Sequence, residues 1–313
     1  MSYMLEALPV LVCAMEFTLG MVGNGFIVLT NSAAWVSSRK FSLIDVILTC
    51  LAVSRICFLG VTMLMLPFKI TRQDMFHLKS RVVGFDMLWT GSNYFSSACS
   101  TCLSMFYFFR IARFTSPVFL WVKWRIRKVL RVVVLAAIAS YSVFLIFVKT
   151  LVKNLAQGWA PRGTNLTFNV MGRSIRNFVT QHILLNLMLL FFFVVSLVSL
   201  LLLTLSLWQH SRRMKQQGLH RSDFSTKAHV RALKTIISFL FFFIVHHVAK
   251  ATVLAGSISD NAGTNRFACM LIFLNPSVHP FLLILWNSKL KQAWLHVLRM
   301  LRGEITARFY KHS

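Results

Sequence analysis

A row of polar side chains interrupts one of the long apolar segments of the chain and could bind a small molecule. On a helix these residues share one face, because they recur at intervals of about three or four: Asp86, Trp89, Thr90, Asn93, Ser97, Ser100 and Ser104. Trp89 would offer an apolar wall, and the amide of Asn93 both donates and accepts hydrogen bonds. We interpret these two as candidate ligand contacts, and favour close helix packing as the role of the serines.

A second polar feature is Arg55, which lies in the middle of an apolar segment. A charge is costly to place in hydrocarbon, so such a residue usually faces the interior of a bundle or water. Asn24 lies at a comparable depth in its own segment, and Asn24 or the backbone carbonyls near Pro276 are candidate partners for the guanidinium. Two roles stay open for this polar core: a structural tether between helices, or a switch that rearranges on activation.

The third feature is a pair of histidines, His246 and His247, in a segment rich in Phe. For His246 we consider a packing role, contact with a ligand, and coupling of a cavity to helix motion. Catalytic signatures are absent: there is no His-x-x-x-His spacing, no Gly-rich phosphate loop and no nucleophile elbow, and the chain has only 8 acidic residues. We therefore expect neither enzymatic activity nor a cofactor or metal site.

The elements that carry these residues are apolar enough to lie in a membrane. Hydrophobic residues make up 57% of the 313 and charged residues only 13%, which is unusual for a soluble domain. A helix needs about 20 apolar residues to cross the hydrocarbon layer. The sequence predicts an all-α membrane protein with seven transmembrane helices at residues 8–30, 43–68, 82–109, 129–149, 183–207, 233–254 and 267–286. Residues 1–290 would form one bundle, and residues 291–313 a short basic tail.

The distribution of positive charge predicts the orientation of this bundle. The net charge is +26, and the loops that alternate from the first one onward hold 22 of the 34 Lys and Arg residues, against 11 for the opposite set. Basic loops stay in the cytoplasm, which places the N-terminus outside and the C-terminus inside. These charges face lipid headgroups. We do not expect nucleic acid binding, because no basic stretch lies in a soluble module with interleaved aromatic residues.

Cysteine and sequon positions agree with this orientation. The 6 cysteines all fall inside predicted helices, so an external disulfide framework is not predicted, and buried thiols that pack as small apolar groups are expected. The sequon Asn165-Leu166-Thr167 lies in the predicted external loop. We expect Asn165 to be glycosylated.

Several motifs resemble those of the bitter taste receptors, a branch of the seven-helix G-protein-coupled receptors. Arg55, where most rhodopsin-like receptors have Asp, is one mark of that family. The most specific is the segment at the inner end of the third helix, which is similar to the family's Phe-Tyr-x-x-Lys-Ile-Ala and Trp-Leu-Lys-Trp pattern. The motifs that carry the resemblance are residues 23–27, 51–55, 106–125, 206–214, 225–234 and 276–292.

Four departures from the family pattern are visible. Arg110 replaces a usual Lys and keeps the charge, and Thr115-Ser116 replaces Ser-His. Pro280 stands in place of a usual Ser and could kink the last helix. His246 aligns where Tyr is common, which puts the usual Tyr-based gating in doubt and admits sensitivity to pH.

The resemblance implies a plasma-membrane, multi-pass receptor for small bitter molecules. Agonists would bind in an outer cavity with Trp89 and Asn93 at its base, and His246 and Cys269 are further candidate contacts. A heterotrimeric G protein of the gustducin or inhibitory type would bind the inner face. Its candidate contacts are Tyr107, Arg110, Lys123, His210 and Lys234.

Two other classes of membrane protein are alternatives to a bitter taste receptor. A vomeronasal type 1 receptor is another rhodopsin-like chemoreceptor, and the Trp-Val-Lys-Trp and Ala-His-Val-Arg-Ala segments speak against it. A transporter or channel would show an inverted repeat or paired broken helices, and the sequence has neither.

Overall fold

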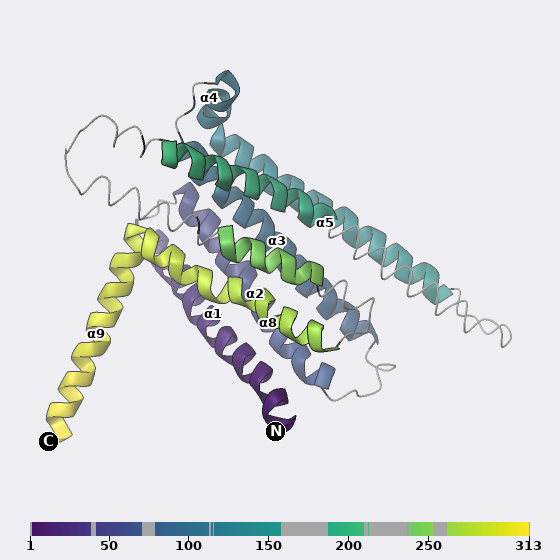
Figure 1. Cartoon of the computed structure of the whole chain (residues 1–313), viewed down its shortest axis with the longest axis horizontal. Coiled ribbons are helices and arrows are strands. Elements are labelled where there is room, and N and C mark those ends of the chain that lie inside the picture. Colours follow the sequence, from purple (N-terminus) through teal and green to yellow (C-terminus); the bar gives the residue numbers. More distant parts are fainter. Residues whose placement is uncertain are drawn as a thin grey trace. The chain divides into compact units, whose positions relative to one another are not determined.

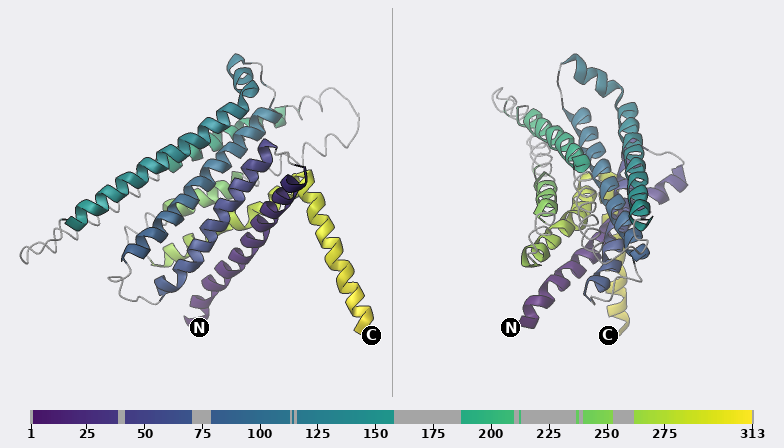
Figure 2. Two further views of the ribbon diagram at one scale, coloured as in Figure 1. Left: turned by 180° about the vertical axis from the view of Figure 1, so that it is seen from behind. Right: turned by 90° about the vertical axis from the view of Figure 1, so that its right-hand side faces the viewer.

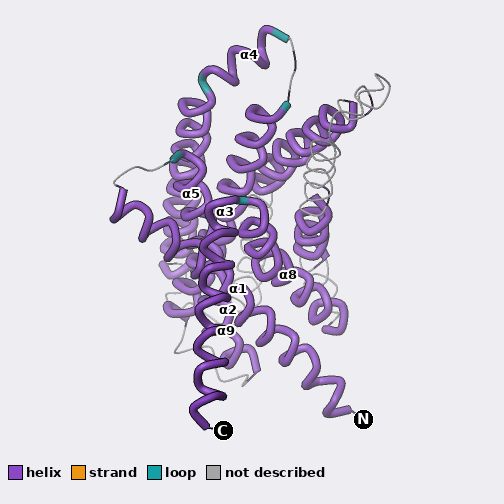
Figure 3. Tube along the Cα trace, turned by 90° about the vertical axis from the view of Figure 1, so that its left-hand side faces the viewer, coloured by secondary structure: helices purple, strands orange, loops and turns teal. Residues whose placement is uncertain are grey.

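The computed structural model describes residues 2–38, 42–70, 79–112, 114, 116–157, 187–209, 212, 237, 240–252 and 262–312. Every regular element in these ranges is an α-helix (Figure 3). The labelled helices are α1 (Ser2–Ser38), α2 (Leu43–Ile70), α3 (Lys79–Ile111), α4 (Pro117–Trp124), α5 (Ile126–Gln157), α8 (Ala262–Trp286) and α9 (Ser288–His312). Two further helices are Leu187–Gln209 and Leu240–Thr252.

The helices group into two compact units. The first unit comprises residues 1–74 and 207–313, and in it α1 packs against both α2 and α8 (Figures 1 and 2). The second unit comprises residues 75–206, and in it α3 packs against α4 and α5.

The expectation of a helical membrane bundle is confirmed. Among the described residues, four helical segments are long and apolar enough to cross a membrane: Leu11–Ser37, Leu43–Leu64, Ile126–Phe147 and Leu187–Gln209. Met270–Trp286 with Ser288–Met300 makes a fifth span if this bent pair is counted as one. Each of the seven predicted segments overlaps a helix in the described ranges. The helix α3 is long but carries the polar row identified above, which lowers its hydropathy.

The helices extend beyond the segments that hydropathy predicts. α1 covers 37 residues, from Ser2 to Ser38, whereas the span predicted from the sequence covers residues 8–30. The basic tail expected at residues 291–313 is helical from Ser288 to His312. This helix, α9, leaves the end of α8 at a bend of 100° (Figure 1).

Glycines allow α1 to approach α8 closely. A Cβ atom at Gly23 would lie 2.9 Å from Cβ of Pro280 and 3.2 Å from the ring of Phe281. A Cβ atom at Gly25, two residues further along the same helix, would meet nothing within 4 Å. The contact between α1 and α8 therefore depends on Gly23 and not on Gly25.

We expect opposite effects from alanine at these two glycines. Gly23→Ala pushes against the rigid ring of Pro280 and should lower stability by about 1 kcal/mol or more. Gly25→Ala removes a flexible helical residue without a clash and should raise stability by up to about 1 kcal/mol. Thermal unfolding of the purified protein in detergent would compare the two variants. Equal midpoints would contradict the close approach of the helices.

Aromatic side chains form the core of the second unit. Tyr94 in α3 stacks on Tyr141 in α5 with 5.6 Å between ring centroids, and Phe192 packs edge-on against Tyr94. The Tyr141 hydroxyl donates to the carbonyl of Met87 at 2.6 Å. Two hydroxyls join α3 to the helix Leu187–Gln209: Thr101 donates to the Phe192 carbonyl at 3.0 Å, and the oxygens of Ser104 and Ser196 lie 2.8 Å apart.

Candidate functional site

The helix α8 contains two prolines, Pro276 and Pro280, one turn apart. Proline has no amide hydrogen, so each proline leaves the carbonyl four residues earlier without its helical donor. Those carbonyls belong to Ile272 and Pro276. In the interior of a membrane protein such groups need other partners, because no bulk water is present to bond them.

Asn24 of α1 supplies the donor for the Pro276 carbonyl. Its side-chain Nδ2 donates to that oxygen at 2.9 Å and to the carbonyl of Gly20 in its own helix at 2.7 Å. Asn24 is 1% exposed. The Asn24 amide thus replaces the backbone hydrogen bond that the Pro276 carbonyl lacks because Pro280 has no amide hydrogen.

His246 plays the same part for the Ile272 carbonyl. Its Nδ1 lies 2.9 Å from that oxygen. A carbonyl only accepts, so Nδ1 carries the proton and donates. Because Asn24 and His246 come from two different helices, both proline-freed carbonyls of α8 are held by side chains from neighbouring helices.

Arg55 of α2 pairs with His279 of α8. Nη1 of Arg55 lies 2.7 Å from Nδ1 of His279, and the two side chains are 1% and 0% exposed. A guanidinium only donates, so the imidazole accepts at Nδ1 and carries its proton at Nε2. A buried cation is thereby tied to the same stretch of α8 that carries the prolines.

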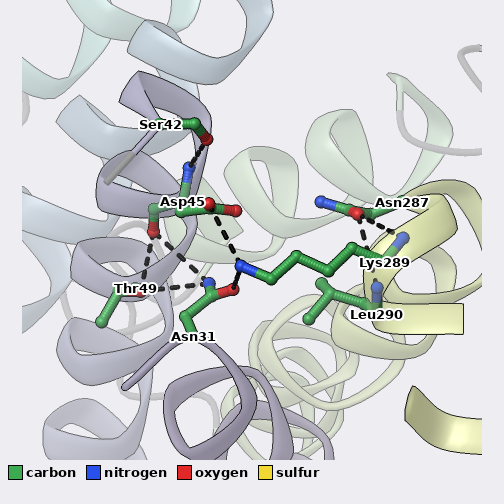
Figure 4. A network of polar contacts seen from close by, with 7 residues as sticks. All are labelled: Asn31, Ser42, Asp45, Thr49, Asn287, Lys289 and Leu290. Carbon is green, nitrogen blue, oxygen red and sulfur yellow. Dashed lines mark hydrogen bonds and ion pairs between the residues drawn. The ribbon is translucent and has the colours of Figure 1, made fainter. Parts of the chain in front are cut away.

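A polar junction joins α1, α2 and α9 near the bend (Figure 4). Nζ of Lys289 donates to Oδ2 of Asp45 at 3.1 Å and to Oδ1 of Asn31 at 3.3 Å. Nδ2 of Asn31 donates in turn to Oγ1 of Thr49 at 3.1 Å. Lys289, the second residue of α9, therefore links this helix to Asn31 of α1 and to Asp45 in the first turn of α2.

Side chains also cap the helices that meet at this junction. Oδ1 of Asn287 accepts from the amides of Lys289 and Leu290 at 3.1 and 3.4 Å, as an N-cap residue does. The hydroxyl of Ser42 accepts from the amide of Asp45 at 3.2 Å at the start of α2. These caps stabilise the helix starts on either side of the junction.

Comparison with known proteins identifies the family. Residues 1–302 match the model of the taste receptor protein family, TAS2R. The chain is 41% identical to taste receptor type 2 member 7 of Papio hamadryas over 90% of both chains. It is 40% identical to the Macaca mulatta protein of that name over 95% of both, and 37% identical to the Rattus norvegicus protein over 99% of this chain and 100% of that one. The chain belongs to the TAS2R family.

Membership makes this chain a bitter taste receptor, a multi-pass protein of the plasma membrane. The family is one of receptors and not of enzymes, and it implies tastant ligands and, in general, coupling to G proteins. The resemblance seen in the sequence motifs is confirmed, and the vomeronasal alternative is not retained.

The predicted site residues of the receptor fall in different parts of the structure. Trp89 is half-buried and Asn93 buried in α3 of the second unit. His246 is buried in the first unit, where α8 also carries Cys269, whose side chain is not among the described ones. At the C-terminal end of α3, Tyr107 is half-buried and Arg110 is exposed.

The remaining predicted contacts are placed only in part. The guanidinium of Arg110 lies 5.6 Å from the ring of Phe106. The ammonium of half-buried Lys123, in α4, lies 5.5 Å from the ring of Phe119. His210, Lys234 and the sequon residue Asn165 lie outside the described residues.

Sequence reasoning missed the partner of Arg55. It named Asn24 and the carbonyls near Pro276, whereas the structure pairs Arg55 with His279 and directs the amide of Asn24 to the Pro276 carbonyl. The bond from Asn24 could have been predicted from the sequence. A proline at position 280 leaves the carbonyl of residue 276 without its helical donor, and the Asn24 amide at a similar depth is a suitable donor.

Proposed function

We propose that this receptor binds small bitter agonists near Trp89 and Asn93 in α3, within the outer cavity that the family resemblance implies. His246 and Cys269 are further candidate contacts. Trp89 supplies an apolar surface, and Asn93 supplies a donor and an acceptor in a buried position. This combination suits a ligand with an apolar body and one or two polar groups.

The proposed response is a shift between two arrangements of the bundle. An agonist activates only if it binds one arrangement more tightly than the other. In the active arrangement the inner face accepts a heterotrimeric G protein of the gustducin or inhibitory type at Tyr107, Arg110, Lys123, His210 and Lys234. This face would be cytoplasmic, the N-terminus and glycosylated Asn165 external, and the remaining inner charges would face lipid headgroups.

The pair of side-chain bonds to α8 is the observation that carries this mechanism. Asn24 and His246 hold carbonyls that prolines have freed, so these bonds can break and re-form without dismantling a regular helix. His246 would therefore couple the ligand to α8, with direct ligand contact as the alternative for the same residue.

Calcium release tests the proposal in cells that express the receptor with a chimeric G protein. A panel of bitter compounds would be applied to the wild type and to Trp89→Ala and Asn93→Ala. Loss of a ligand hydrogen bond at Asn93, worth about 1 kcal/mol, should weaken potency about fivefold to tenfold. Trp89→Ala should weaken it at least as much, because it removes an apolar wall.

Leu88→Ala is the matched control, since Leu88 precedes Trp89 in α3 and its side chain is 59% exposed. Its response should equal that of the wild type at equal surface expression. A response that survives both Trp89→Ala and Asn93→Ala would move the binding site elsewhere. Silence of the wild type across the panel, with surface expression confirmed, would argue against the agonist class.

A further inference from the structure

The short helix α4 (Pro117–Trp124) exposes an unusual amount of apolar surface for a helix of 8 residues. Trp124 is 87% exposed, Val118 74%, Trp121 56% and Leu120 43%. On a helix Val118, Trp121 and Trp124 lie on the side opposite Phe119, and Leu120 lies at the edge of that side nearest Lys123. We call these four exposed residues the α4 apolar face.

The structure holds this face in a fixed orientation. The Ser116 hydroxyl accepts from the amide of Phe119 at 3.2 Å and caps the helix, and Pro117 occupies its first turn. Phe119 is 7% exposed and packs among Phe108, Phe109 and Phe114. Because one side of α4 is anchored in this aromatic cluster, the opposite side must point away from it.

The position of α4 in the chain places it at the membrane surface. The membrane span of α5 begins at Ile126, two residues after α4 ends. Consecutive Cα atoms lie about 3.8 Å apart, so Trp124 lies within roughly 8 Å of the start of that apolar span. A helix of this length reaches about 12 Å and cannot cross a hydrocarbon layer of about 30 Å. It therefore lies along the surface.

Positive charge surrounds the α4 apolar face. The guanidinium of Arg125 lies 4.9 Å from the ring of Trp121, and Arg127, Lys128 and Arg131 are exposed on the first turns of α5. The sequence contains no Asp or Glu between residues 87 and 222. Exposed Trp beside Arg and Lys suits the headgroup region, where an apolar ring and a cation both find partners.

We propose that α4 and the first turns of α5 form an interfacial anchor, in which Trp121 and Trp124 enter the cytoplasmic leaflet and Arg125, Arg127 and Lys128 bind its anionic headgroups. The inference rests on the orientation given in the proposed function. It leaves Lys123, on the Phe119 side of α4, available to the G protein.

Tryptophan fluorescence of the full-length receptor in nanodiscs tests the anchor. The difference between the wild type and Trp124→Phe isolates the emission of Trp124. Nanodiscs would contain phosphatidylcholine alone or with phosphatidylserine, each with and without tail-brominated lipid. We expect this emission to be quenched by brominated lipid, shielded from aqueous acrylamide, and quenched more strongly in the discs with phosphatidylserine.

A pair of charge variants tests the role of the basic residues. Arg125→Gln combined with Lys128→Gln should abolish the difference between the two lipid compositions. Lys123→Gln removes a charge from the opposite side of the same helix and should leave it unchanged. Size-exclusion profiles would confirm that each variant is folded.

Two outcomes would overturn the proposal. Quenching of Trp124 by acrylamide and not by brominated lipid would show a face in water, open to a protein partner such as the G protein. Equal quenching in both lipid compositions would refute the binding of anionic headgroups. No agonist or G protein takes part in the measurement, so its failure is distinguishable from a failure of the proposed function.

Discussion

Replacing His279 with alanine is expected to destabilise the receptor by about 1.5–3 kcal/mol, because it removes the hydrogen bond that the imidazole accepts from the buried guanidinium of Arg55. The donor and acceptor nitrogens lie 2.7 Å apart, and both side chains are almost fully enclosed. A hydrogen bond to a charged group is stronger than a neutral one, and the cost of an unmet charge rises where water is absent.

Thermal unfolding in detergent, together with surface expression, would measure this loss. His279→Gln retains an acceptor oxygen and should recover part of the stability. Ser277→Ala is the matched control, since Ser277 lies two residues away in α8, is equally buried and donates only to the carbonyl of Phe273 within its own helix. A midpoint for His279→Ala that equals that of Ser277→Ala would show that the pair contributes little.

The buried polar residues could be recognised from the sequence, because the free-energy cost of placing a polar side chain in an apolar segment depends on that segment alone. Arg55 and Asn24 stand out in apolar segments whatever their neighbours are, and the structure buries both. The same holds for the membrane helices, since length and apolarity suffice to detect them.

The partners of these residues could not be recognised in this way. Arg55 and His279 are 224 positions apart, and periodicity within a helix does not say which helix packs beside it. For the same reason the sequence did not decide among three roles for His246: packing, ligand contact, or coupling of a cavity to helix motion. Its bond to Ile272 depends on the placement of two helices and on the effect of Pro276 on the backbone.

The helices α4 and α9 were not predicted from the sequence, for a different physical reason. Hydropathy detects helices that are long and apolar enough to cross a membrane, whereas α4 has only 8 residues and α9 mixes apolar and basic residues. The basic residues of both segments were interpreted as topogenic charge that faces lipid headgroups, and Lys123 also as a G-protein contact, but not as parts of helices. The i to i+4 spacing of Trp121 and Arg125 indicates that a helix would bring ring and guanidinium together, and the structure shows that contact.

Asn24→Ala is expected to cost about 2 kcal/mol, and Pro280→Ala should cancel most of that cost. In the wild type, Pro280 has no amide hydrogen for the Pro276 carbonyl, and Asn24 supplies the donor at 2.9 Å. Alanine at position 280 restores a backbone amide and hence the helical bond to the same carbonyl. The Asn24 side chain is then no longer needed there.

A double-mutant cycle on thermal stability measures this coupling, which should be about 1–2 kcal/mol if the two residues serve one carbonyl. Asn24→Ala in the Pro280→Ala background should then be nearly neutral. Additive costs would mean that Asn24 acts through its other contacts, such as the bond to Gly20. A coupled result would show that Asn24 supplies the hydrogen bond to the Pro276 carbonyl that α8 cannot form itself at Pro280.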